Sequence, residues 1–291
     1  MNERSVKVDP LNPSTQTIIG LGVLQILVWG GSFFILAVMA EPIMRETGWA
    51  SQWVYGALSL SLMVAALLAP LSSRLVARYG GRSQLAGSGA VVALGLLIMA
   101  ASHSLALFLL AWAVIGVGMA MGLYEALFST LGALYAEGGG RAITGITLIS
   151  GFASTLSWPA VALLIEQFGW RVACVAYALV LLLVVAPLYM KVLPKGGQGE
   201  QAKLATAGES AVVDRRLYLL LTAIFALGAI IMTAVAVQLV AVLQGLGHSL
   251  PAAIGLAAML GPGQVASRGL QILAGKRDPI WPPLCFEALV G

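Results

Sequence analysis

Glu125 is the residue whose type and surroundings most directly indicate chemistry. It lies in the apolar segment GMAMGLYEALFSTLGALY, residues 118–135, and a carboxylate in hydrocarbon is so unfavourable that it marks a functional site or an ion pair. Gly118, Gly122, Glu125 and Ser129 recur at spacings of four, three and four, which predicts a common helix face that another helix or a ligand approaches closely. Two interpretations stay open: a group that takes up and releases a proton, or half of an ion pair that fixes helix packing.

Arg268 is the natural partner of that carboxylate. Gly261, Gln264 and Arg268 are spaced by three and four residues and share a predicted face, and Pro262 between two glycines predicts a kink. A guanidinium grips a carboxylate through two hydrogen bonds, which indicates binding of an organic anion. The alternative is an arginine whose long side chain reaches the lipid headgroups.

Further candidates for a ligand path are weaker. Gln25 and Trp29 lie one helical turn apart, and Trp158 lies next to Pro159. A tryptophan in a membrane span more often packs against neighbours or anchors at the interface. We therefore place Gln25, Trp29 and Trp158 behind Glu125, Arg268 and Gln264 as candidate substrate or coupling residues.

Other chemistry has little material in this chain. It contains two histidines and two cysteines, without the spacing of a disulfide framework or a metal site. We find no nucleophile–base constellation, and no predicted strand precedes a glycine-rich loop. We expect no enzyme activity, no metal, no cofactor and no nucleic-acid partner.

The elements that must position these residues are membrane spans. Of the 291 residues 59% are hydrophobic and 10% are charged, whereas soluble proteins keep roughly a quarter charged. A span needs about 20 apolar residues. Eight segments qualify: residues 17–39, 51–73, 85–101, 105–136, 143–165, 172–190, 217–243 and 249–273. The sequence therefore predicts an all-α integral membrane protein that contacts the lipid bilayer.

The positive charges predict the orientation. Of the 16 lysine and arginine residues, all but Arg45 and Arg171 fall on one side of the predicted membrane. Because lysine and arginine accumulate in cytoplasmic loops, we expect a multi-pass protein of the cell membrane with a cytoplasmic N-terminus.

The long polar segment 191–216 divides the chain. We predict a cytoplasmic tail at 1–16, a six-span half at 17–190, a central loop at 191–216, two spans of a second half at 217–275, and a non-spanning tail at 276–291. The halves look related, since the pair Gly48 and Gly56 has a counterpart in Gly247 and Gly255. Three prolines in the final tail exclude a further span there, from which we expect a truncated or frame-shifted reading of a longer gene.

The segment from Ser73 to Arg82 resembles the loop between spans two and three of the major facilitator superfamily. The family pattern is Gly-x-x-x-Asp-Arg-x-Gly-Arg-Arg, and Arg78, Gly80 and Arg82 match it. Ser73 replaces the first glycine and Ala77 replaces the aspartate, which puts the family's charge-relay clamp in doubt.

Two shorter features also look like that family: Gly169-Trp170-Arg171, and Arg141 with Gly145. The resemblance runs from about Thr17 to Arg277. It implies a helical bundle with a complete six-helix half plus about two helices of a second half. It also implies that Arg74, Arg78, Gly80 and Arg82 form a conformational-switch loop.

The expected function is secondary active transport of a small organic solute by alternating access. From Glu125 and Arg268 we predict more specifically that the solute is an organic anion and that its transport is coupled to protons. We expect no obligate protein partner. The alternative is a truncated, non-transporting membrane fragment of such a permease.

Overall fold

The computed structural model describes residues 13–135, 139–194 and 215–273. The side chains of residues 77, 217, 218, 225 and 268–273 lie outside this description, and so do most of the predicted central loop and both predicted tails. Every regular element in the described ranges is a helix. The all-α fold predicted from the apolar composition is therefore confirmed.

Several membrane passes are built from two or three consecutive helical pieces. The segments η1 and η2 are π-helical turns inside such passes, where the backbone is locally widened. In chain order the elements are α1 (Thr15–Trp29), η1 (Gly30–Phe34), α2 (Ile35–Thr47), α3 (Ser51–Tyr79), α4 (Gly81–Ala100), α5 (Leu105–Gly122), α6 (Tyr124–Leu134), α7 (Gly139–Ser150), α8 (Ala153–Val180), η2 (Leu181–Val185), α9 (Ala186–Val192), α11 (Arg215–Gly245), α12 (Leu250–Ala258) and α13 (Leu260–Leu273).

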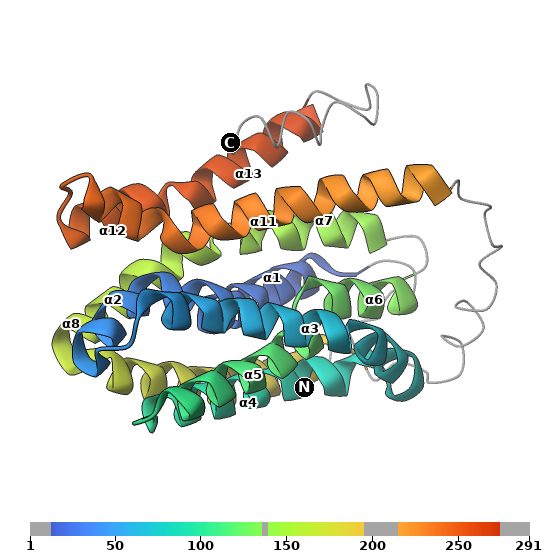
Figure 1. Ribbon diagram of the computed structural model, residues 1–291. Coiled ribbons are helices and arrows are strands. Elements are labelled where there is room, and N and C mark those ends of the chain that lie inside the picture. Colours follow the sequence, from blue (N-terminus) through green and yellow to red (C-terminus); the bar gives the residue numbers. More distant parts are fainter. Residues whose placement is uncertain (1–12, 136–138, 195–214, 274–291) are drawn as a thin grey trace, which may run out of the picture.

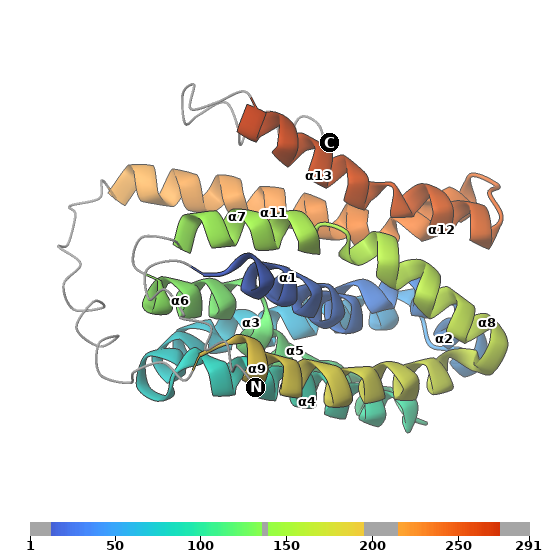
Figure 2. The same ribbon diagram turned by 180° about the vertical axis from the view of Figure 1, so that it is seen from behind.

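Seven helical segments of the described chain are long and apolar enough to cross a membrane. One of them, residues 139–192, contains 54 residues and would extend about 80 Å if straight, far more than a bilayer core of about 30 Å. It instead reverses within α8, where Gly169 adopts φ 80°, and Figure 2 shows the chain folding back there. This segment therefore supplies two passes, and the described chain makes the eight that hydropathy predicts.

The turns alternate between two ends of the bundle (Figure 1). The end that holds Gly48, Gly169 and Gly247 is named the outer end here, after the predicted orientation, and Gly80 marks the inner end. All four glycines have positive φ, a conformation that side-chain-bearing residues rarely adopt. Four of the chain reversals therefore coincide with glycine, whereas the turn between α4 and α5 contains none.

Small residues allow the helices of the first six passes to pack closely. A Cβ at Gly95 would overlap Ile115 of α5, and one at Gly116 would overlap the backbone of Ser61 in α3. Ser61 also donates a hydrogen bond to the Trp112 carbonyl at 2.5 Å. Because lipid gives no hydrophobic drive between helices, such close backbone contact and buried hydrogen bonding stabilise the bundle.

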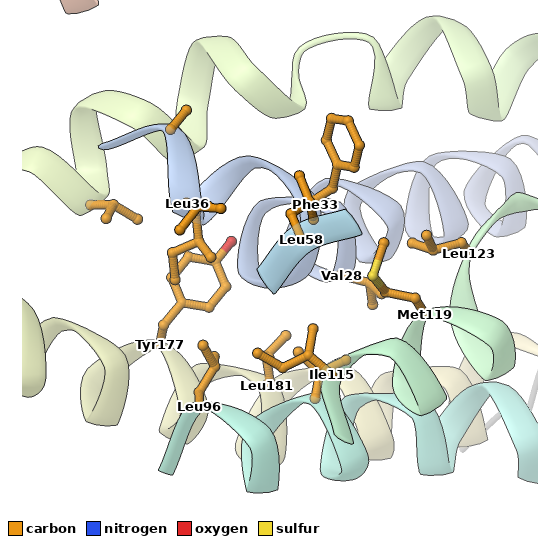
Figure 3. Close-up of a cluster of buried hydrophobic side chains, with 14 of the residues drawn as sticks. Val28, Phe33, Leu36, Leu58, Leu96, Ile115, Met119, Leu123, Tyr177 and Leu181 are labelled. Carbon is orange, nitrogen blue, oxygen red and sulfur yellow. The ribbon is translucent and has the colours of Figure 1, made fainter. Parts of the chain in front are cut away.

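The apolar core of this bundle is formed by side chains from several passes. Figure 3 shows Leu36, Leu58, Leu96, Ile115 and Leu181 converging. These five belong to α2, α3, α4, α5 and η2, and each is at most 2% exposed. The core therefore joins the first four passes to the sixth.

The last two passes form a second group against the first. We name α1 to α9 the six-pass group and α11 to α13 the two-pass group. Helix α11 packs against α2, while α12 and α13 pack against α8, where Thr155 Oγ1 donates to the Ala258 carbonyl at 2.6 Å. The buried residues of α11 lie in its last third, at Ala236, Val237 and Val240. The described contacts of α11 with the six-pass group therefore concentrate toward the outer end.

The predicted spans 17–39 and 51–73 leave residues 40–50 between them as a loop, and most of that segment is helical instead. Glu41, Pro42, Arg45 and Glu46 lie in α2, which ends at Thr47. An i,i+4 ion pair between Glu41 and Arg45 at 2.5 Å supports the polar final turn. Helical hydrogen bonding therefore continues beyond the apolar run that defines the span.

A polar cluster ties three pass ends together at the outer end. Glu46 of α2 accepts from Trp170 Nε1 at 2.6 Å and from Arg171 Nε at 3.0 Å. Arg171 Nη1 donates in addition to the carbonyls of Ala100 and Ser102, at 2.7 and 2.8 Å. The end of α2, the end of α4 and the reversal in α8 are thus held by one guanidinium and one carboxylate.

Candidate functional site

A cavity of about 390 Å³ lies between the six-pass and two-pass groups. Its volume falls in the range of small-molecule sites, about 300–1,000 Å³. The lining is mainly aromatic and aliphatic, with a few polar groups: Trp29, Phe33, Phe34, Leu62, Tyr124, Glu125, Ser150, Gly151, Ala229, Met232, Thr233, Ala236, Leu260 and Gln264.

Interrupted helices bring these residues together. The π-helical turn η1 carries Phe33 and Phe34, and a break at Leu123 (φ −77°, ψ −172°) precedes Tyr124 and Glu125. The chain also breaks between α7 and α8, next to Ser150 and Gly151, and between α12 and α13, next to Leu260. At membrane depth irregular backbone is tolerated where it is buried in protein or lines a cavity. Four passes thus lose helical regularity where they meet this cavity.

Glu125 lies in the first turn of α6 and is exposed. A helix N-terminus carries partial positive charge and favours a carboxylate nearby. Among the described residues that line the cavity, Glu125 is the one acidic side chain, and none of them is a lysine, arginine or histidine. The described walls thus contain a single carboxyl group.

The face predicted for Gly118, Gly122, Glu125 and Ser129 is not continuous, and the break at Leu123 is the reason. A Cβ at Gly118 would overlap Val92, and one at Gly122 would overlap Ser88, so both glycines pack against α4. Glu125 follows the break and lines the cavity instead. Periodicity of 3.6 residues cannot be carried across a non-helical residue.

Tyr124 lines the cavity beside Glu125 because both begin the new helix. Its hydroxyl is hydrogen-bonded to Ser150 Oγ at 2.7 Å, which joins the start of α6 to the end of α7. Its ring centroid lies 5.0 Å from that of Trp29 and 5.1 Å from that of Phe128, which it stacks at 11°. Tyr124 therefore connects two helix interruptions and one aromatic wall.

Trp29 is the centre of that wall. Its ring contacts Phe33 and Phe34, with centroids at 5.5 and 6.1 Å, in addition to Tyr124. Its Nε1 is buried and has no hydrogen-bond partner in the described part of the chain. Buried tryptophan N–H groups usually find an acceptor, so this group is an exception among the described residues.

Two predicted site residues lie behind the wall. Gln25 is fully buried and donates through Nε2 to the Gly122 carbonyl at 2.8 Å and to the Tyr189 hydroxyl at 3.2 Å. Trp158 is also fully buried and donates through Nε1 to the Phe34 carbonyl at 2.9 Å. Each thus holds a carbonyl at or beside an interruption, and neither is among the lining residues.

Of the predicted pair, the structure describes the side chain of Glu125 but not that of Arg268. Gln264 lines the cavity, and Arg268 follows one turn later on α13. The Arg268 side chain lies outside the described residues, so its contact with Glu125 stays a prediction. The kink predicted around Pro262 has a counterpart in the interruption at Met259, where α12 ends and α13 follows.

The predicted switch loop is a single turn residue between two helices, which corrects its extent. Arg74 and Arg78 lie on α3 and are exposed, and Arg82 lies on α4. Gly80 alone has non-helical backbone, with φ 83°. Arg82 Nη2 donates to the Met190 carbonyl, so it links the third pass to the sixth. That these four residues act as a conformational switch remains a prediction.

Several lining residues were not predicted from sequence, Phe33, Phe34 and Ser150 among them. Adjacent small residues offered a signal, since Gly30-Gly31 opens η1 and Ser150-Gly151 lies at the α7–α8 break. Paired glycine or serine residues are a recognised cause of helix distortion. The apolar run alone carries no such information.

Comparison with known proteins identifies the family of this chain. A search of curated proteins returned no match. The family model of the Major Facilitator Superfamily matches residues 21–286, which is most of the chain. The protein therefore belongs to the Major Facilitator Superfamily, the family of membrane transporters that its sequence resembles.

Proposed function

We propose that this protein moves a small organic solute across the membrane through the described cavity, and that Glu125 couples the movement to protons. The observation that carries the proposal is the position of Glu125, a carboxylate on an aromatic cavity wall between two helix groups. Carboxylates placed inside membrane proteins commonly mark proton relays and substrate paths. Protonation would remove the one full charge among the described lining residues.

The helix arrangement supports alternating access around this cavity. Transporters bind substrate near interrupted helices at the interface of two helix groups, which then rock against each other. Here the cavity joins Trp29 and Glu125 of the six-pass group to Thr233 and Gln264 of the two-pass group. A movement of one group against the other would therefore change the access to Glu125.

The charge environment of Glu125 is simple among the described residues. Tyr124 is the other titratable side chain that lines the cavity, and Arg268 on α13 has a side chain outside the described residues. The prediction of an organic anion rests on that arginine and stays a prediction. The prediction of proton coupling rests on Glu125 and does not depend on it.

The test uses the purified 291-residue protein in lipid vesicles loaded with a pH-sensitive dye. A panel of small carboxylates, sugars, primary amines and quaternary ammonium compounds is added outside, one compound at a time. We expect at least one compound to change the internal pH in vesicles that contain the wild type. Glu125→Gln should abolish that pH change, since glutamine cannot release a proton. At compound concentrations high enough to offset weaker binding, it should still exchange the labelled compound against itself.

Glu166→Gln is the matched control, because Glu166 is an exposed carboxylate in α8 that does not line the cavity. It should behave as the wild type. An unchanged pH response in Glu125→Gln would refute the coupling role. A wild type that moves no compound of the panel would refute the transport proposal and support the alternative of a non-transporting fragment.

A further inference from the structure

The charge and shape of the cavity point to a class of solute. Resting on the proposed function, we infer that the cavity binds a monovalent organic cation, in particular a quaternary or aromatic ammonium compound, with Glu125 as its counter-ion. Four of the described lining side chains are aromatic (Trp29, Phe33, Phe34 and Tyr124) and one is a carboxylate. No lysine or arginine is among the described residues that line it.

The aromatic wall has the geometry that attracts cations. Trp29 and Tyr124 have centroids 5.0 Å apart with their planes at 47°, and Phe33 and Phe34 flank Trp29 at 69° and 40°. These four rings line one cavity at different inclinations, as the walls of an aromatic cage do. Quaternary ammonium groups bind in such aromatic cages through cation–π attraction, to which tryptophan contributes most.

The carboxylate lies at the edge of this same surface. Glu125 is the next residue after Tyr124 and lines the same cavity. An organic anion would bring a second negative charge beside Glu125, which like-charge repulsion opposes. An organic cation is attracted both by the ring faces and by the carboxylate, so the described walls discriminate between the two charges.

Competition for Glu125 would couple cation transport directly to proton transport. A proton and an organic cation are both neutralised by the carboxylate of Glu125, so each lowers the affinity for the other. A proton bound on one side of the membrane would leave when the cation binds, and the cation would leave when a proton binds. One monovalent cation is thereby exchanged for one proton without net transfer of charge.

Two probes of matched shape and opposite charge test the inference. Benzyltrimethylammonium and phenylmethanesulfonate share a benzyl group, and neither changes its charge with pH, because one is a quaternary ammonium and the other a sulfonate. Binding is measured by calorimetry on the 291-residue protein in lipid nanodiscs, without any gradient. We expect the ammonium compound to bind and the sulfonate not to bind. Cation binding should weaken at any pH low enough to protonate Glu125, because protonation removes the counter-ion.

Four variants separate the contributions to cation binding. Glu125→Gln should weaken benzyltrimethylammonium binding about tenfold or more, and Trp29→Phe about threefold, because phenylalanine is a weaker cation–π partner. Glu125→Asp keeps the charge and should retain part of the affinity, which controls for misfolding of the amide variant. Glu166→Gln should bind as the wild type.

A separate experiment tests whether the charge of Arg268 selects anions. If the arginine side chain faces the cavity and selects anions, phenylmethanesulfonate will bind the wild type and Arg268→Gln will lose that binding. That result would overturn the inference, as would equal benzyltrimethylammonium affinity in Glu125→Gln and the wild type. Absence of any benzyltrimethylammonium binding at millimolar concentration would overturn it too.

These outcomes are independent of the transport test. Cation binding through Glu125 without any pH response in vesicles would refute the transport proposal and leave the cation site intact. A carboxylate or sugar that moves protons, together with no benzyltrimethylammonium binding, would support transport and refute the cation site.

Discussion

At the scale of single residues, the polar side chains around the cavity divide by what they bind. Gln25 and Trp158 donate to the main-chain carbonyls of Gly122 and Phe34. These carbonyls lie at or beside irregular backbone, where ordinary i→i−4 hydrogen bonding is incomplete. Trp29 makes no such hydrogen bond among the described residues, and it lines the cavity. The first two side chains therefore stabilise the irregular backbone, and the ring of Trp29 forms part of the cavity wall.

Gln25→Leu should therefore mainly lower stability, whereas Trp29→Phe should mainly lower ligand affinity. Gln25→Leu leaves the Gly122 carbonyl and the Tyr189 hydroxyl without this donor, which should lower the free energy of unfolding by about 1–3 kcal/mol. Trp29→Phe should change stability less and should weaken benzyltrimethylammonium binding. Thermal unfolding and calorimetry on both variants measure the two effects. Val23→Ala is the control, because Val23 is exposed on the same helix.

A Gln25→Leu protein of wild-type stability and altered ligand affinity would contradict this assignment, since it would place Gln25 in the cavity. The sequence singles out Glu125, Trp29 and Gln264, which line the cavity, because polar or large residues in apolar runs are conspicuous. It could not separate Gln25 from Trp29. They lie one turn apart on α1, and only the neighbouring helices decide which of them is covered.

At the scale of elements, hydropathy predicts how many passes there are but not where each helix ends or breaks. Helix α2 runs past its apolar segment to Thr47, and α3 carries Arg74 and Arg78 beyond the predicted span. Helical hydrogen bonding does not require apolar side chains, so polar turns extend a span into water. The interruptions at Leu123 and Met259 are equally invisible to hydropathy, because each lies within a segment that is apolar on average.

The outer polar cluster should act as a clamp between elements. Arg171→Met removes donors from the Ala100 and Ser102 carbonyls and the partner of Glu46, so it should lower the free energy of unfolding by about 2 kcal/mol. Glu46→Gln should change it by less than about 1 kcal/mol, since an exposed ion pair is weak. Arg45→Met is the control: Arg45 pairs within one helix and its side chain is 77% exposed.

Chemical denaturation of the two single variants and of the double variant measures the coupling. Strictly additive losses would show that Glu46 and Arg171 act separately. Equal losses in Arg171→Met and Arg45→Met would show that the contacts between α2, α4 and α8 do not stabilise the bundle.

At the scale of the whole molecule, the basic residues and the order of the passes both distinguish the inner end of the bundle from the outer end. Among the described residues, the basic side chains near the inner end are Arg74, Arg78, Arg82, Arg141, Lys191, Arg215 and Arg216, whereas Arg45 and Arg171 lie near the outer end. This distribution follows from the order of the passes and needs no knowledge of side-chain packing. It is the reason why the sequence predicts orientation more securely than it predicts the cavity.

The predicted orientation, with the N-terminus in the cytoplasm, is testable by thiol labelling of intact cells. His103 is exposed in the turn before α5 at the outer end, and Gly140 is exposed near the start of α7 at the inner end, where a Cβ meets no neighbour. Both substitutions, His103→Cys and Gly140→Cys, are made in a Cys285→Ser background. Cys174 is buried and is left in place.

A membrane-impermeant maleimide should label the thiol introduced by His103→Cys in intact cells. It should label the thiol introduced by Gly140→Cys only after the membrane is permeabilised. The reversed pattern would invert the orientation, and the proton and the organic cation would then reach Glu125 from the opposite compartments. The Cys285→Ser background without either new thiol should stay unlabelled in both states, because the fully buried Cys174 is inaccessible to the reagent.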